Sequence, residues 1–299
     1  MYAFAQFIMK NRAYAIGIAA LLGRFSIIIP PLSLFSGATV GLVTLQRGVK
    51  EGLIVISGAT FFLGLASLIV IKKIDLAFLL FIGLWLPSLL GCWILRISRS
   101  QTFTLLAIGG ISSSFAIGMH LAVGDVVLWW QQIIEQIIQQ SNIKGAAAEQ
   151  FTQRKSLVLM NGLVAMFFGL NLMMTILLAR WWQGLLYNPS GFIREFHGLH
   201  LPYQLSWVAI LLTIVALIND HNAESHITTD LLIIMIMMYL FQGISAIHGL
   251  VAARNLPRLW LFPVYLGLFF LSPYFVIGIA IIGIADTLVN FRRPNLPKR

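Results

Sequence analysis

Residues 157–180 read LVLMNGLVAMFFGLNLMMTILLAR, an apolar run with no charged side chain before Arg180. A helix needs about 20 such residues to cross the hydrocarbon core of a bilayer, so this run predicts a transmembrane helix. Five more runs meet the same requirement: 52–71, 76–95, 101–123, 203–219 and 231–253. The sequence therefore predicts an all-α fold, a polytopic bundle of transmembrane helices.

The composition favours a membrane protein and excludes other classes. Hydrophobic residues make up 59% of the 299 residues and charged residues only 10%, whereas about 25% are charged in soluble domains. So few charges cannot cover a soluble globule, and a disordered chain is excluded because too much apolar surface needs burial. The apolar runs are too long for the strands of an outer-membrane barrel, which have about 10 residues. We expect a single transmembrane domain over 1–299.

Two longer apolar stretches, 13–46 and 259–289, are interrupted by proline at Pro30-Pro31 and at Ser272-Pro273. Proline ends or kinks a helix because it lacks the backbone N–H. Each stretch is either a hairpin of two short helices or one kinked, tilted helix. Hairpins give about ten spans and kinked helices about eight, since each span needs about 20 residues; we favour the hairpins. The one cysteine, Cys92, can form no disulfide within the chain.

Charge sets the orientation, because positively charged loops stay in the cytoplasm. With hairpins at both ends, fourteen cations lie on the side of the termini: Lys10, Arg12, Arg47, Lys50, Arg96, Arg99, Arg180, Arg194, Arg254, Arg258, Arg292, Arg293, Lys298 and Arg299. Five lie on the other side: Lys72, Lys73, Lys144, Arg154 and Lys155. Both termini are therefore predicted to be cytoplasmic, with the protein in an inner membrane.

The outer segment 124–156 contains WWQQIIEQIIQQ at 129–140, where apolar and polar pairs alternate every two residues. On a helix this pattern gives one apolar face, which suits a helix lying in the membrane interface. The segment is either a connector resting on the membrane or a lid over an outer cavity.

Polar side chains inside the predicted spans are expensive unless they face protein or water. We predict a substrate-binding cavity lined by Asn171, Gln242 and His248, with Arg24 as the partner of an anion. The alternative is separate helix-packing contacts, and for Arg24 a side chain that reaches the outer interface. Asp286 is either held by Arg293 two turns further on or forms a proton or cation site.

Other chemistry is not indicated. The sequence has no GxSxG, P-loop, HExxH or paired CxxC motif, so we expect no enzyme activity and no cofactor. Neither the outer loop 220–230 nor Glu195 with His197 and His200 has the spacing of a metal site. The net charge of +10 is accounted for by the inner loops, so we expect no nucleic acid. The expected partners are the lipid bilayer, a small solute and other membrane subunits.

The predicted inner loop has the most distinctive sequence, ARWWQGLLYNPSGFIREFH at 179–197. Trp181, Trp182 and Tyr187 are typical of an aromatic belt at the headgroup level. Asn188 to Gly191 form a turn signal.

This loop resembles the YybS-like family of bacterial membrane proteins, a family of unassigned function, through the pattern ARWWQxLLYNPxGFxxEFH. Supporting matches are LVTLQRGVKEG at 42–52, LWLP at 84–87, QGxxxxHG at 242–249 and GxADxxxxFR at 283–292. The motif residues are Arg180, Trp181, Trp182, Asn188, Pro189, Gly191, Phe192, Glu195, Phe196 and Asp286.

The family is distantly similar to the substrate-binding membrane subunits of energy-coupling-factor transporters. Those subunits dock a partner through small residues on their first helix, for which Ala15 to Ala19 would serve here. The resemblance thus favours small-molecule binding or transport. The alternative is a scaffold that positions partners through the cytoplasmic loop 181–202.

The orientation can be tested with single cysteines in a Cys92→Ala background. An Asn142→Cys substitution should react with a membrane-impermeant thiol reagent in intact cells, because the outer segment faces outside. An Asn255→Cys substitution, in an inner loop, should react only after the cells are opened. Labelling of position 142 only in opened cells would contradict the orientation.

Overall fold

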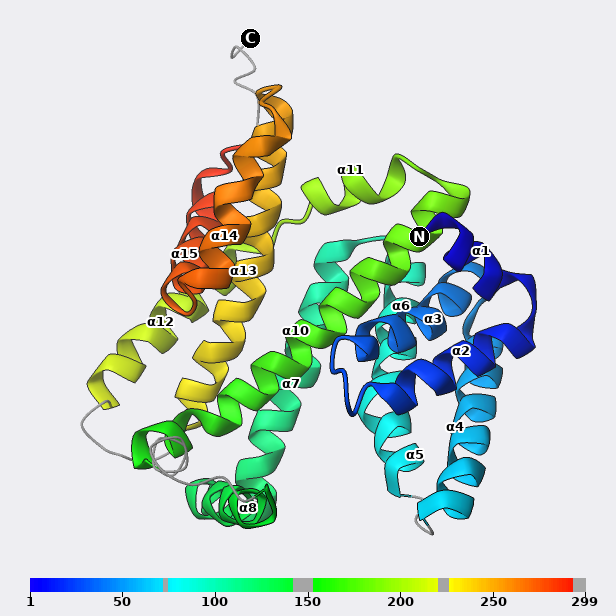
Figure 1. Cartoon of the computed structure of the whole chain (residues 1–299). Coiled ribbons are helices and arrows are strands. Elements are labelled where there is room, and N and C mark those ends of the chain that lie inside the picture. Colours follow the sequence, from blue (N-terminus) through cyan, green and yellow to red (C-terminus); the bar gives the residue numbers. More distant parts are fainter. Residues whose placement is uncertain (72–74, 142–152, 220–225, 293–299) are drawn as a thin grey trace. The chain divides into compact units, whose positions relative to one another are not determined.

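The computed structural model describes residues 1–71, 75–141, 153–219 and 226–292 (Figure 1). Every regular element in these ranges is a helix, which confirms the all-α prediction. Five helical stretches are long and apolar enough to cross a membrane: Val49–Ile69, Leu76–Ser98, Gln101–Val123, Ser156–Tyr187 and Ile227–Ala253. Shorter apolar helices are Tyr203–Ile218, Arg258–Phe270 and Tyr274–Val289. The polytopic helical architecture is confirmed, and the number of spans stays a prediction.

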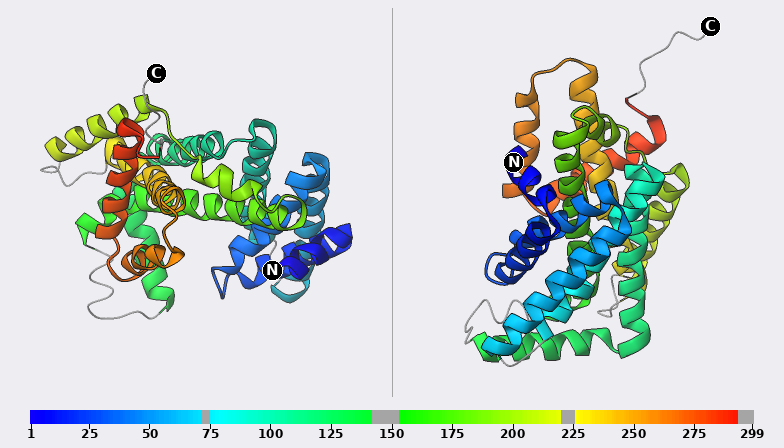
Figure 2. Two further views of the ribbon diagram at one scale, coloured as in Figure 1. Left: turned by 90° about the horizontal axis from the view of Figure 1, so that it is seen from above. Right: turned by 90° about the vertical axis from the view of Figure 1, so that its right-hand side faces the viewer.

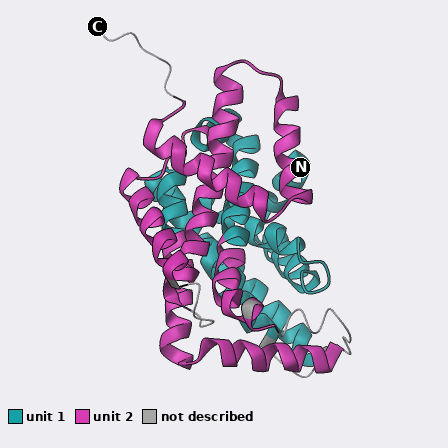
Figure 3. Ribbon diagram, turned by 90° about the vertical axis from the view of Figure 1, so that its left-hand side faces the viewer, with its two compact units in different colours: residues 1–108, 170–196 teal, residues 109–169, 197–299 magenta. Residues whose placement is uncertain are grey.

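The chain divides into two compact units, coloured separately in Figure 3. Unit 1 comprises Met1–Ile108 and Leu170–Phe196, and unit 2 comprises Gly109–Gly169 and His197–Arg299. The assignment of the whole chain to one transmembrane domain stays a prediction.

Unit 1 is built around the buried helix α3 (Leu32–Arg47). Its elements are α1 (Tyr2–Lys10), α2 (Arg12–Phe25), α3 (Leu32–Arg47), α4 (Val49–Ile71), α5 (Asp75–Leu80), the π-helical turn η1 (Phe81–Trp85), α6 (Leu86–Ser98), the start of α7 (Gln101–Val123), the end of α10 (Arg154–Tyr187) and most of α11 (Gly191–His197). Every residue of α3 from Ser36 to Leu45 is buried. Small residues let the neighbours approach: a Cβ on Gly37 would lie 2.7 Å from Thr175, and one on Gly41 2.8 Å from Ala179.

The stretch 13–46 is a hairpin, as favoured from the sequence. Helices α2 and α3 are separated at the proline pair and pack on each other. The Ser36 hydroxyl of α3 donates a hydrogen bond to the Ala19 carbonyl of α2 at 2.7 Å. Ala15 and Ala19, the proposed docking seam, are themselves buried in unit 1.

The predicted span 76–95 is continuous but irregular. It runs through α5, η1 and α6, with Pro87 at the start of α6. Proline removes one helical hydrogen bond and clashes with the preceding turn, which explains the wider π turn just before it. Trp85 of η1 is fully buried and donates from Nε1 to Ser36 Oγ at 2.9 Å.

Unit 2 is organised around α13 (Ile227–Ala253). The unit also contains the remainder of α7 and α10, with α8 (Val126–Ser141), α12 (Tyr203–Asn219), the 3₁₀ turn η2 (Arg258–Leu261), α14 (Phe262–Phe270) and α15 (Tyr274–Val289). After α13 the chain turns back through η2 and α14, then reverses again into α15 beside α13 (Figures 1 and 2). The stretch 259–289 is thus two helices folded back on each other.

The chain changes direction between α7 and helix α8, which runs along the lower edge in Figure 3. Only Val126 and Val127 at its start are buried, and Ile137 is 51% exposed. Trp129, Trp130, Ile133 and Ile134 are partly covered, and a helix that lies in the membrane interface stays a prediction. Part of the predicted lid, residues 142–152, lies outside the described residues.

The contact between α13 and α15 predicts a sensitive position. A Cβ on Gly243 would collide with the Ile279 carbonyl oxygen, a backbone atom that cannot move unless α15 moves. We expect Gly243→Ala to destabilise the purified protein by about 1–3 kcal/mol, the usual range for overpacking. Thermal unfolding in detergent measures the effect.

Gly278→Ala is the matched control, because nothing lies within 4 Å of a Cβ at this position of α15. It should leave the unfolding temperature unchanged or raise it, since alanine is the better helix former. Equal destabilisation by both changes would contradict the close crossing.

Candidate functional site

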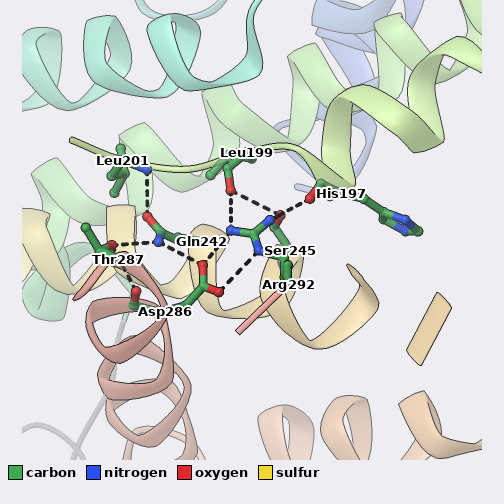
Figure 4. Close-up of polar contacts among 9 residues, drawn as sticks. His197, Leu199, Leu201, Gln242, Ser245, Asp286, Thr287 and Arg292 are labelled. Atoms are coloured by element: carbon green, nitrogen blue, oxygen red, sulfur yellow. Dashed lines mark hydrogen bonds and ion pairs between the residues drawn. The ribbon is translucent and has the colours of Figure 1, made fainter. Parts of the chain in front are cut away.

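Two polar clusters are built from residues of the sequence motifs, one in each unit. The cluster of unit 2 forms where α15 ends (Figure 4). Asp286 is fully buried, and Arg292 donates to it from Nη2 to Oδ2 at 2.5 Å and from Nε to Oδ1 at 3.2 Å. Both carboxylate oxygens therefore contact one guanidinium. Arg293, which was one of two alternatives predicted for Asp286, lies outside the described residues.

Arg292 also holds the segment that follows α11. Its remaining donors reach the carbonyl oxygens of His197 at 2.5 Å and Leu199 at 2.7 Å, and the hydroxyl of Ser245 at 3.0 Å. These carbonyls lie at and beyond the end of α11, where helix geometry leaves them without an intrahelical donor. Burial and the charge of Arg292 lower the pKa of His197, so this side chain adds no second positive charge.

Gln242 completes the network between helices. It is fully buried; its Nε2 donates to Thr287 Oγ1 at 2.6 Å and to Asp286 Oδ2 at 3.2 Å, and its Oε1 accepts from the Leu201 amide at 2.8 Å. Figure 4 shows these groups converging. This geometry fastens α13, α15 and the 197–201 segment together.

The cluster of unit 1 surrounds a polar cavity of about 460 Å³. Its lining residues are Leu45, Gln46, Leu95, Arg96, Arg99, Arg180, Gln183, Asn188 and Glu195. Three guanidinium groups and one carboxylate give the lining a net charge of two positive units, and three amide side chains add hydrogen-bond donors and acceptors.

Arg180 and Glu195 form the rigid wall of this cavity. Arg180, at the end of α10, donates to both Glu195 oxygens at 2.8 and 2.5 Å and to Gln183 Oε1 at 3.3 Å. Glu195 reaches it because the chain turns sharply between α10 and α11. Gly191 leaves room for these side chains in that turn, since a Cβ would lie 2.9 Å from Asn188 Cγ and 3.0 Å from Arg180 Nη2.

Arg96 and Arg99 supply the other two charges. Arg96 donates to the carbonyl oxygens of Leu45 at 2.5 Å and Thr44 at 3.3 Å, in the last turn of α3, where the helix dipole favours a cation. Arg99 has the left-handed conformation, with φ of 53°, at the end of α6. Its guanidinium makes no hydrogen bond or ion pair to a described residue, so its charge is available to a ligand.

The residues predicted to share a substrate cavity belong to different units. In unit 1, Arg24 lines a mainly apolar hollow of about 320 Å³, and Asn171 donates to Ser33 Oγ at 3.0 Å. In unit 2, Gln242 joins the network above, and His248 Nε2 lies 2.7 Å from the Tyr265 hydroxyl. A cavity shared by all four stays a prediction.

The aromatic residues of the motif differ from the predicted belt. Trp182 is fully buried in unit 1, with its ring centroid 5.4 Å from that of Phe4 and 6.0 Å from that of Phe35. The belt interpretation is therefore wrong for Trp182, which is a core residue. Tyr187 is exposed and fits the interface, while Phe192 and Phe196 stack on each other along α11.

Sequence reasoning missed Arg96, Arg99, Gln46 and Gln183 as site residues. Gln183 Nε2 donates to Gln46 Oε1 at 3.2 Å across 137 residues of sequence. No local spacing could indicate that pairing. Within the described ranges, no group of three or more His, Cys, Asp or Glu side chains could hold a metal ion; most of the outer loop considered as a metal site, residues 220–225, lies outside those ranges.

A family model described as "Predicted membrane protein (DUF2232)" matches residues 17–287 of the chain. Neither a curated protein nor a solved structure matches the chain. The matched range includes both polar clusters except for Arg292.

The Arg292 network predicts a strong effect on stability. Arg292→Gln should destabilise the protein by about 3–5 kcal/mol, because it leaves Asp286 buried without its cation. Thermal unfolding and the folded yield after size-exclusion chromatography measure the loss. Arg12→Gln is the control: Arg12 also pairs with a carboxylate, Glu51, but its side chain is 57% exposed. The control should unfold like the wild type, and equal losses would contradict the role of burial.

Proposed function

Because the chain belongs to the family of predicted membrane proteins known as DUF2232, we propose that it is a multi-pass protein of the bacterial inner membrane that binds a small anionic solute. The ligand site is the cavity of unit 1, which we name the arginine cavity, lined by Arg96, Arg99 and Arg180. The solute carries a carboxylate or a phosphate group, the two anions that guanidinium groups recognise best.

The observation that carries the proposal is the charge imbalance of the cavity. One carboxylate, Glu195, faces three guanidinium groups, and both of its oxygens are already bonded to Arg180. Arg99 therefore has no counter-charge among the described residues. An anion entering the cavity would supply it, and a volume of about 460 Å³ lies in the range of small-molecule sites.

The arrangement is suited to binding. Arg180 and Arg96 are fixed by Glu195 and by backbone carbonyls, so their donors need little reordering when a ligand enters. The guanidinium group of Arg99 has no such described partner, so it can move toward the ligand. Both oxygens of Glu195 are bonded to Arg180, so this carboxylate is not free to act as a general base. The proposed role is therefore that of a binding protein and not of an enzyme, and it involves no cofactor.

The cavity would open toward the cytoplasm. All three arginines belong to the fourteen cations on the side of the termini, which the positive-inside rule assigns to the cytoplasm. A solute-binding role is also what the resemblance to substrate-binding subunits of energy-coupling-factor transporters implies. Other membrane subunits would then supply the energy for transport.

Anion binding can be tested on the full-length protein in a neutral detergent. Inorganic phosphate or citrate should raise the unfolding temperature above that in chloride of equal ionic strength. Arg99→Gln should weaken that binding about tenfold or more, since a hydrogen bond to a charged group contributes about 1.5–3 kcal/mol. Without ligand its unfolding temperature should match the wild type, because Arg99 holds no described neighbour.

Arg254→Gln is the matched control, because Arg254 is an exposed arginine in the connection after α13 and does not line the cavity. It should bind phosphate and citrate like the wild type. If neither salt stabilises the protein more than chloride, the scaffold alternative acting through 181–202 is favoured. If phosphatidylglycerol alone stabilises it in an Arg99-dependent way, the ligand is a lipid headgroup and not a solute.

A further inference from the structure

A second buried aspartate of unit 2 lies in quite different surroundings from Asp286. Asp230 was predicted to lie in the outer loop 220–230, but α13 begins at Ile227. Asp230 lies in the first turn of this helix and is fully buried. His120 Nε2 of α7 lies 2.8 Å from Asp230 Oδ2, and Asn161 Nδ2 of α10 donates to the same oxygen at 2.6 Å. Three helices thus converge on one carboxylate oxygen.

The other oxygen of this carboxylate is not satisfied. Asp230 Oδ1 is buried and makes no hydrogen bond of normal geometry to a described residue, although the backbone of Gly162 lies close to the carboxylate. Asn161 Oδ1 is also buried without a donor among the described residues. The site is nevertheless closely fitted, because a Cβ on Gly162 of α10 would lie 2.9 Å from both the Cα and the Oδ1 of Asp230. Buried oxygens without donors are rare in folded proteins, so this carboxylate needs a physical explanation.

No permanent cation is in contact with this carboxylate among the described residues. From α7 the titratable neighbour is His120; α10 presents Asn161 and Gly162, neither of which titrates; on α13 itself His226 lies one turn earlier. The contrast with Asp286 is direct, because Arg292 gives that carboxylate two hydrogen bonds and a fixed positive charge.

A carboxylate charge buried without such a partner is costly. A proton that arrives through His120 Nε2 joins Oδ2, the oxygen that this nitrogen contacts. It removes the charge of the carboxylate, and the new hydroxyl group donates back to Nε2. Oδ2 still accepts from Asn161 in that state. His120 is 12% exposed at its side chain, so it is the member of the group through which a proton can reach Asp230.

We propose that Asp230, His120 and Asn161 form a proton-binding site within the helix bundle of unit 2. In the step, one proton from solvent joins the Asp230 carboxylate by way of the His120 imidazole, and the total charge of the group rises by one unit. No bond between heavy atoms forms or breaks. The site gives the protein a means to couple a conformational change to a proton, and it does not rest on the arginine cavity.

Infrared difference spectroscopy of the full-length protein in detergent tests the site, because a protonated carboxyl group has its own C=O stretching band. A spectrum taken at about pH 5 minus one at about pH 8, the range in which imidazole titrates, should contain this band. Asp230→Asn should remove it. Asp125→Asn, the matched control at an exposed aspartate, should leave it unchanged.

The His120→Gln variant provides a second test in case Asp230→Asn does not fold. The new amide can still donate to Oδ2 but cannot take up a proton, so the midpoint of the band should move by about one pH unit or more. An unaltered midpoint would overturn the role of His120. A band that persists unchanged in Asp230→Asn would overturn the site itself.

Sodium distinguishes a proton from a metal cation at the same oxygens. The band should be equal in choline chloride and sodium chloride at fixed pH. Its disappearance in sodium chloride would overturn the proton assignment. None of these samples contains phosphate or citrate, so failure here is distinguishable from failure of anion binding.

Discussion

The whole structure depends on one constraint: a polar group held away from water must find its partner inside the chain. Arginine meets this constraint where helices end, because its five donors can bond several carbonyl oxygens at once. Arg47 donates to the Met9 carbonyl near the end of α1, Arg96 to carbonyls of α3, and Arg292 to those of the segment after α11. The side chains whose charge predicts the orientation therefore also bond the free carbonyl oxygens at helix ends.

Close helix packing is the condition for these contacts. Hydrocarbon gives helices little reason to associate, so small residues must bring backbones within reach. Gly243 and Gly283 do this between α13 and α15, where a Cβ on either would collide with the backbone of the other helix. Only at that separation can Gln242 bond Thr287 and Asp286 directly. The glycines and the buried amide are thus parts of one contact.

The sequence indicated the helices well and their partners poorly, for a physical reason. Span length and proline breaks are local properties, so the runs and the hairpin at 13–46 could be predicted. Partners are set by packing between distant segments: Gln46 meets Gln183, and Arg292 holds Asp286 although Arg293 has the better helical spacing. Trp182 shows the same dependence on distant segments. Tryptophan suits both a membrane interface and a protein core, and its packing against Phe4 and Phe35 places this residue in the core.

Three carboxylates differ in whether an arginine pairs with them, and this difference separates structural groups from candidate functional ones. Asp286 and Glu195 each receive two hydrogen bonds from a guanidinium, so they hold Arg292 and Arg180 in place. Asp230 receives an amide and an imidazole instead. Since neither of those partners carries a permanent charge, the charge of Asp230 can vary with its surroundings. In the arginine cavity the imbalance is reversed, and Arg99 is left without a carboxylate. The groups able to change state or bind are those for which the fold supplies no opposite charge.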